Sequence, residues 1–480
     1  MTTTPIDPVG ILVEGAAARV LLPGFDGFTL PAWLDARLRN GLAGVCLFGE
    51  NVESREQLRA LTAAITAANP DALIAIDEEG GDVSRLYQAT GAPFPGNALL
   101  GRIDDLDYTA RVATAVGLEL RAVGVNLNFA PDVDINSNHD NPVIGVRSFG
   151  TDPGRVAAHS AAWIAAHEAT GVAVSAKHFP GHGDTAQDSH LALPVVDLPL
   201  NELRERELVP FEASVAAGAS TIMSSHILLP QLDADNPATF SSAVLDGLLR
   251  GELGFRGVIV SDALDMVGAS GEIGLAEAAV RAIAAGCDLL CIGTKNTDDQ
   301  LEAIGAALAD AVAEGRLPAA RLAEAGDRNV ALARRLAASP PAAVADTAFP
   351  IETAIAAFAV KPGVVVAPRL FVVALETAAN IAVGRSPWGP PAVARLSEGD
   401  PLPAVDGQLV LVGKNNHRHG WVRELADRAR IDYPGALVVD MGWPDLNQNY
   451  SDVATFGASR HVGEALAAWL ANAESEGGTP

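Results

Sequence analysis

The chain has 480 residues, of which 49% are hydrophobic and 19% are charged, a composition typical of a globular protein with room for more than one domain. Its 33 Lys and Arg residues are outnumbered by 59 Asp and Glu residues, so the formal net charge is -26. This surplus of carboxylates repels phosphate groups and excludes nucleic acid and anionic membranes as partners. No apolar run reaches the roughly 18 residues of a membrane span, and the N-terminus lacks a signal-peptide pattern, so we expect a cytoplasmic protein.

Short apolar runs alternate with amphipathic stretches over the first 340 residues. The predicted strands are residues 18–25, 41–49, 72–77, 125–133, 172–178, 220–227, 257–263 and 287–293. The predicted helices between them include residues 54–68, 109–122, 154–170, 201–217 and 275–285. Apolar runs without polar alternation are typical of parallel strands buried on both faces, and about eight strand–helix repeats predict an α/β fold of the (β/α)8 TIM-barrel type.

A stretch rich in Pro and Ala separates this barrel from a second, smaller domain. We predict a catalytic barrel over residues 1–338, a linker over 339–350 and an α/β sandwich with a mostly parallel sheet over 351–480. The alternation in the last segment runs through residues 370–375, 408–413, 422–430, 436–440 and 462–471. The three cysteines, Cys46, Cys287 and Cys291, lie in apolar runs, which favours buried strand positions over disulfides or metal ligands.

Polar residues gather at or just after the C-terminal ends of the predicted strands. They are Asp77, Asp132, Lys177, His178, His226 and Asp262. In a parallel barrel these ends meet at one face, and that face carries the chemistry. Asp262, directly after an apolar strand, is placed to act as a carboxylate nucleophile, and Asp265 is its local competitor. Arg147 follows a long polar loop, where its guanidinium could hold a sugar hydroxyl or an amide oxygen.

One loop after the fifth predicted strand concentrates groups able to act as ligands or as acid–base groups: Lys177, His178, His182, Asp184, Asp188 and His190. Two interpretations stay open from these residues alone. In the first, His178, His182, Asp188 and His190 bind Zn²⁺ or Fe²⁺, although their spacing matches no motif known to us. In the second, Asp188 orients His190 as a general acid/base, while Lys177 and His178 hold polar groups of a substrate.

The run Lys-His-Phe-Pro-Gly-His-Gly-x-Thr-x-x-Asp-Ser-His over residues 177–190 resembles the signature of glycoside hydrolase family 3, in its β-N-acetylglucosaminidase branch. The resemblance covers roughly residues 10–335. It implies that Asp262 is the nucleophile, and that His190 is the general acid/base with Asp188 as its partner. It also implies that the sugar hydroxyls are bound by Asp77, Arg147, Lys177 and His178, with no metal and no organic cofactor. One departure is Asp82, where the branch usually has Arg or a similar residue.

The predicted function is therefore that of a retaining exo-β-N-acetylglucosaminidase acting on glycosides derived from peptidoglycan or chitin. A small carbohydrate is the only partner that the sequence implies, and it leaves the oligomeric state open. The nearest alternative is a β-N-acetylglucosaminide phosphorylase, because a neutral histidine does not repel phosphate as a carboxylate would. More distant alternatives are a metal-dependent hydrolase and a non-catalytic sugar-binding protein.

Overall fold

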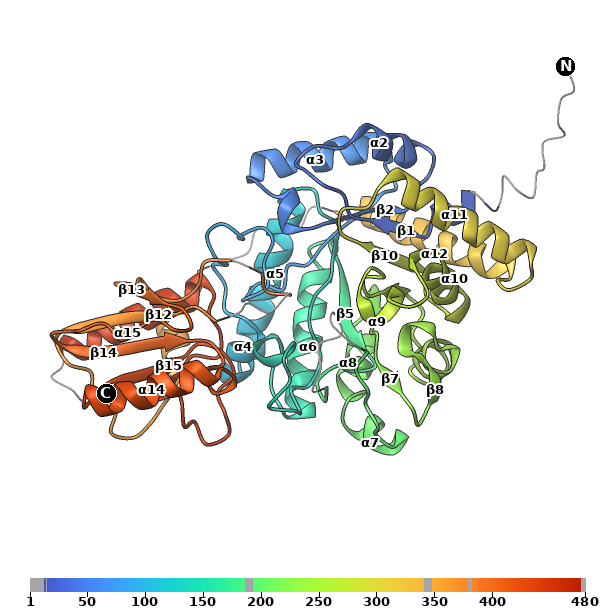
Figure 1. Ribbon diagram of the computed structural model, residues 1–480. Coiled ribbons are helices and arrows are strands. Elements are labelled where there is room, and N and C mark those ends of the chain that lie inside the picture. Colours follow the sequence, from blue (N-terminus) through green and yellow to red (C-terminus); the bar gives the residue numbers. More distant parts are fainter. Residues whose placement is uncertain are drawn as a thin grey trace, which may run out of the picture.

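Eight parallel strands form the central sheet of the larger unit in the computed structural model (Figure 1). The structure describes residue 13 and residues 15–185, 193–340, 348–377, 382–384 and 386–475. The strand order is β1-β10-β9-β6-β5-β4-β3-β2, and the neighbouring strands described here pair in parallel. The two end strands, β1 and β2, contact each other, so the sheet is a nearly closed barrel. This confirms the predicted (β/α)8 class.

All eight predicted barrel strands are present, most of them shorter than expected: each lies inside its predicted range, except that β5 extends one residue beyond it. They are β1 (Leu21–Pro23), β2 (Gly44–Leu47), β3 (Leu73–Ile76), β4 (Leu127–Asn128), β5 (Ala173–Phe179), β6 (Thr221–Ser224), β9 (Val258–Ser261) and β10 (Leu289–Gly293). Every residue of these strands is buried. Cys46 and Cys291 belong to the apolar cluster that these strands form, in agreement with their predicted strand positions.

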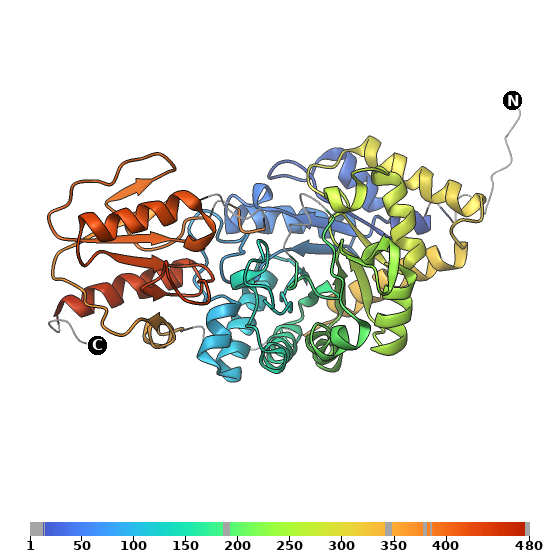
Figure 2. The ribbon, with the colours of Figure 1, turned by 60° about the horizontal axis from the view of Figure 1, so that its bottom comes forward.

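Helices surround the barrel, as Figures 1 and 2 show. They are α2 (Ala32–Arg39), α3 (Arg55–Ala68), α4 (Asn97–Ile103), α5 (Leu106–Ala122), α6 (Pro153–Glu168), α7 (Leu200–Glu205), α8 (Val209–Ala216), α9 (Val267–Ser270), α10 (Leu275–Ala285), α11 (Asp298–Ala313) and α12 (Ala319–Ala337), with a π-helix, η4 (Ala243–Glu252). The single helix predicted over 201–217 is instead two, α7 and α8. Pro210 lies in the first turn of α8, where a missing N–H is tolerated, whereas inside a continuous helix it would break the hydrogen-bond ladder. A short hairpin, β7 (Leu228–Leu229) and β8 (Asp233–Pro237), was not predicted.

The smaller unit is the predicted α/β sandwich. Its sheet order is β11-β16-β15-β14-β12-β13, with strands β11 (Ala359–Val360), β12 (Leu370–Leu375), β13 (Ala394–Leu396), β14 (Gln408–Gly413), β15 (Leu437–Asp440) and β16 (Val453–Ala454). Among the described residues of this sheet, β11 and β16 pair antiparallel and the other neighbouring strands pair in parallel. Val410 and Val412 pack toward α13 (Ile351–Ala356) and α15 (Arg460–Ser475), whereas Leu409 and Leu411 pack toward α14 (Gly420–Asp432). Alternate side chains thus bury both faces.

The smaller unit packs against the side of the barrel that carries α4 (Figures 1 and 2). Leu99 of α4 belongs to its apolar core, and Arg102 donates to the carbonyl of Ala357 at 2.8 Å. Since α12 ends at Ala337 and α13 begins at Ile351, we propose to keep residues 1–338, 339–350 and 351–480 as barrel, linker and second domain. No helix among the described residues is long and apolar enough to cross a membrane.

Candidate active site

A network of buried ions lies at the C-terminal ends of β3 and β5, where the sequence predicts a sugar-binding set. The ammonium of Lys177 lies 2.7 Å from Asp77 Oδ1 and 2.9 Å from Glu79 Oε1. Arg147 Nη2 lies 2.8 Å from the same Glu79 oxygen. The side chains of Lys177, Glu79 and Arg147 are only 3–4% exposed. Two predicted residues from separate parts of the chain, Lys177 and Arg147, therefore meet at the carboxylate of Glu79, which was not among the predicted site residues.

The residues of this network stay ionised although they are buried, because each carries a neighbour of opposite charge. Burial by itself would raise the pKa of Glu79, but the charges of Arg147 and Lys177 lower that pKa to about 2. Burial would likewise lower the pKa of Lys177, yet Asp77 and Glu79 raise it above its ordinary value. The site thus presents a rigid set of charged donors and acceptors, which suits the binding of sugar hydroxyls.

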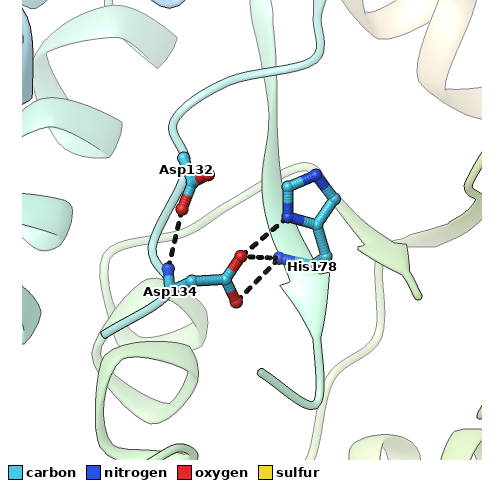
Figure 3. A group of neighbouring side chains, drawn as sticks. All are labelled: Asp132, Asp134 and His178. Carbon is cyan, nitrogen blue, oxygen red and sulfur yellow. Dashed lines mark hydrogen bonds and ion pairs between the residues drawn. The ribbon is translucent and has the colours of Figure 1, made fainter. Parts of the chain in front are cut away.

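His178 is held as a neutral imidazole between the carboxylate of Asp134, drawn in Figure 3, and the guanidinium of Arg147. Its Nδ1 lies 2.7 Å from Asp134 Oδ2, and its Nε2 lies 3.4 Å from Arg147 Nη2. Because a guanidinium can only donate, Nε2 accepts and Nδ1 carries the proton. Burial, assisted by the positive charge of Arg147, lowers the pKa of His178 to about 4, so the ring is neutral near pH 7.

Asp262 follows β9 directly and is partly exposed at the barrel mouth. Its Oδ1 accepts the backbone N–H of Ala263 at 2.8 Å. Burial lowers the pKa values of both His178 and His182, whose rings lie 5.9 Å apart, and the negative charge of Asp262 partly offsets this lowering, so all three occupy one electrostatic environment. Asp262 therefore lies at the same face as the ion network.

Asp265, the other carboxylate of this segment, binds a backbone group of another loop. Its Oδ2 accepts the backbone N–H of Thr294 at 2.9 Å, in the loop after β10, and its side chain is exposed. Asp265 thus makes a structural contact on the rim, and Asp262 stays the predicted nucleophile.

The predicted acid/base pair, Asp188 and His190, falls in residues 186–192, outside the described residues. The loop that leads to it is anchored: Asn141 Nδ2 donates to the carbonyl of His182 at 2.8 Å and to that of Gly183 at 3.0 Å. The roles of Asp188 and His190 stay predictions.

Two residues of the cluster were missed by sequence reasoning, Glu79 and Asp134. Asp134 accepts from the ring of His178 and from the backbone N–H of His182 at 2.7 Å. Each lies two positions after a residue that had been noticed, Asp77 or Asp132. Alternate residues of an extended segment point the same way, and this spacing is the signal that could have identified them.

One group of described side chains could offer ligands to a metal ion. Asp132, Asp134 and His178 offer ligand atoms within 4.8 Å of one another (Figure 3). However, both ring nitrogens of His178 already have partners, and Arg147 Nη2 lies 3.3 Å from Asp132 Oδ2. A metal cation would have to displace these bonds beside a fixed guanidinium, so this donor set favours a network of hydrogen bonds and ion pairs.

Glu78 provides a test of these electrostatics. It is buried, its Oε2 accepts the N–H groups of Arg85 and Leu86 at 2.9 Å, and burial raises its pKa to about 7. Between pH 4.5 and about 7 the folded state holds a proton that the unfolded state has lost. The stability that this carboxyl contributes is therefore complete below pH 4.5 and lost as pH rises through about 7.

We accordingly expect Glu78→Gln to gain stability relative to the unmodified protein from pH 5 to pH 8. The gain should be at most about 3 kcal/mol in the free energy of unfolding and should appear as a higher thermal midpoint relative to the unmodified protein. The measurement is thermal unfolding at both pH values, with Glu56→Gln at an exposed position as the control. A difference that is constant with pH would contradict this assignment.

The fold and the site together define a class of protein. A parallel barrel that collects a strand-end carboxylate, two buried cations and a neutral histidine at its C-terminal face is a barrel enzyme suited to a hydroxyl-rich substrate. Residues 35–332 match the N-terminal domain of glycosyl hydrolase family 3. The chain belongs to this family, whose substrates are carbohydrates.

Comparisons with individual proteins agree with the family. The chain is 40% identical over 316 residues to beta-hexosaminidase A of Pseudoalteromonas piscicida, a match that spans 60% of this chain and 53% of that protein, about half its length. It is also 40% identical over 284 residues to a beta-hexosaminidase of Stenotrophomonas maltophilia strain K279a, covering 57% of this chain and 83% of the relative.

A solved structure extends the similarity to the second unit. A glycoside hydrolase family 3 beta-N-acetylglucosaminidase from Paenibacillus sp. FPU-7 aligns with a TM-score of 0.85 and 29% identity. The alignment covers 97% of this chain and 98% of that one, so both share the combination of barrel and smaller α/β unit.

Proposed function

We propose that this protein is a retaining exo-β-N-acetylglucosaminidase. The observation that carries the proposal is the Lys177–Glu79–Arg147 network beside the strand-end carboxylate of Asp262, in a chain of glycosyl hydrolase family 3. The names of its relatives, beta-hexosaminidase and beta-N-acetylglucosaminidase, support an N-acetylated sugar as the substrate.

In the proposed mechanism, Asp262 attacks the anomeric carbon and forms a covalent glycosyl-enzyme through an oxocarbenium-like transition state. His190 protonates the leaving oxygen and then removes a proton from the water that releases the sugar, while Asp188 orients its ring. The two displacements at the same carbon retain the anomeric configuration.

The sugar-binding part of the proposal rests on the described ion network. Lys177 lies where it can donate to sugar hydroxyls, and Asp77 can accept from them. His178, whose Nδ1–H is bonded to Asp134, can take part as an acceptor through Nε2. Glu79 fixes Arg147 and Lys177, so these side chains do not reorganise when the sugar binds. We further propose glycosides derived from peptidoglycan or chitin as substrates and the cytoplasm as the location.

The experiment is a product assay on an aryl β-N-acetylglucosaminide and the matching aryl β-glucoside, each with and without inorganic phosphate. We expect release of N-acetylglucosamine, first as the β-anomer by NMR, with kcat/KM at least about 10²-fold above that for the glucoside. Equal cleavage of both glycosides would contradict the proposed substrate. Formation of N-acetylglucosamine 1-phosphate would show that the enzyme is a phosphorylase and not a hydrolase.

A further inference from the structure

A pocket lies between the barrel and the second domain, next to the sugar-binding network. It is small, with a volume of about 60 Å³. The barrel contributes Asp82 and residues 141–147, which end at Arg147, and the second domain contributes Thr377, Asn415 and the cationic Lys414 and Arg418. Since Arg147 lines this pocket and also binds Glu79, the pocket adjoins the proposed sugar site.

The second-domain wall of the pocket is at the topological switch point of its sheet. The chain leaves β12 for the edge strand β13 and then crosses to β14 on the other side of β12. In open parallel α/β sheets, ligands bind outside the carboxyl ends of the two strands where the order reverses. Thr377 follows β12 and Lys414 follows β14, so both line this crevice.

Two cations on this wall, Lys414 and Arg418, form no ion pair with the described residues, although the charges of Asp82 and Asp440 act on them at longer range. Lys414 Nζ lies 4.7 Å from the centroid of the Trp388 ring, and Arg418 Nη2 donates to the carbonyl of His139 at 2.9 Å. The buried Nε of Arg418 makes no hydrogen bond to the described part of the chain. Among the described residues, neither cation lies within the 4.0 Å of an ion pair, whereas Arg147 is fully paired.

The neighbouring helix adds positive potential. His419, which lines the pocket, is the N-cap of the 13-residue helix α14 and makes no side-chain capping bond. The first N–H groups of a helix and its dipole attract anions.

The carboxylates near the pocket are occupied by backbone donors. Asp82, which lines it, accepts the N–H of Ala458 at 2.7 Å. Asp440 accepts from the N–H groups of Asn415 and Gly442, at 2.7 and 2.8 Å. Asp82, the position at which the sequence departs from its family branch, thus has an interdomain role, and its carboxylate also interacts electrostatically with Lys414.

We propose that this pocket binds an anionic group, a carboxylate or a phosphate, carried by the glycoside whose sugar sits against Arg147. The proposal rests on the proposed function for the identity of that sugar. Two cations that form no ion pair with the described residues, and a helix N-terminus, line a switch-point pocket beside the sugar site, and an anion is a ligand that suits all three. The second domain then selects charged glycosides over neutral ones.

The kinetic test compares Lys414→Met/Arg418→Met with Arg369→Met/Arg428→Met, which removes the same charge from exposed ion pairs with Asp406 and Asp432. Three substrates are compared. They are a neutral aryl N-acetylglucosaminide, the same glycoside with a phosphate ester on its sugar, and an N-acetylglucosaminide whose aglycone carries a carboxylate. We expect the KM of at least one charged glycoside, relative to that of the neutral one, to rise at least tenfold in the first double variant only. Equal ratios in both double variants would overturn the proposal.

A binding measurement separates this proposal from the proposed function, because it needs no cleavage. Titration calorimetry with inorganic phosphate and with acetate should detect binding of at least one anion to the unmodified protein and to the Arg369→Met/Arg428→Met control. The same heat should disappear in the Lys414→Met/Arg418→Met protein, with folding checked by circular dichroism. No binding to the unmodified protein, or undiminished binding to the variant, would overturn the anion site even if the enzyme cleaves N-acetylglucosaminides as proposed.

Discussion

Replacement of Asp262 by Ala is expected to lower kcat on an aryl N-acetylglucosaminide by about 10⁴-fold or more. The carboxylate at this position supplies the bond to the anomeric carbon in the proposed mechanism, and neither water nor the rest of the site replaces it. Because Asp262 is partly exposed in the loop that follows β9, the protein should stay folded. Steady-state kinetics with an unfolding curve for each variant make the measurement.

Two further readouts distinguish a nucleophile from a residue that merely supports the site. A fluorinated N-acetylglucosaminyl substrate should label the peptide that contains Asp262, and azide should restore turnover of the Ala variant by taking the place of the carboxylate. Asp265→Ala is the matched control, because Asp265 lies three residues further on but binds Thr294. Labelling at another residue, or an equal loss of activity in the control, would refute the assignment.

The second large effect is expected for Glu79→Gln. This change leaves the buried Arg147 and Lys177 without the anion between them, and breaking a buried ion pair of this kind costs about 3–5 kcal/mol. We expect a fall of this order in the free energy of unfolding. We also expect kcat/KM to drop by at least about 10²-fold, because the donors for the sugar hydroxyls lose their positions.

Denaturant unfolding and kinetics test this prediction, with Glu277→Gln as the control. Glu277 also contacts two cations, Arg281 and Arg316 at 3.0 and 3.3 Å, but on the exposed surface, where such pairs contribute only about 0–1 kcal/mol. If Glu79→Gln were no more destabilising than the control, the network would not be the rigid element that the mechanism needs.

Much of the fold could be predicted because the physics of this barrel is local. Strands buried on both faces appear as apolar runs, and all eight were located in this way, as was the alternation of β12, β14 and β15 with helices. Because parallel strands end at one face, Asp77, Lys177 and Asp262 could also be recognised as members of one site.

Other features depend on contacts between distant parts of the chain, which no local pattern encodes. Glu79, rather than Asp77, lies between Arg147 and Lys177, because the loops after β3 and β4 and the strand β5 meet there. Asp134 decides the proton position of His178 for the same reason.

By itself, then, the sequence determined the barrel, the second α/β domain and the strand-end positions of the predicted nucleophile and sugar-binding residues, since burial and strand direction leave periodic signals. Only the tertiary structure decided which carboxylate pairs with which cation. It also decided that Lys414 and Arg418 face Arg147 across a domain boundary, because charge pairing depends on distances in space between segments up to about 270 residues apart.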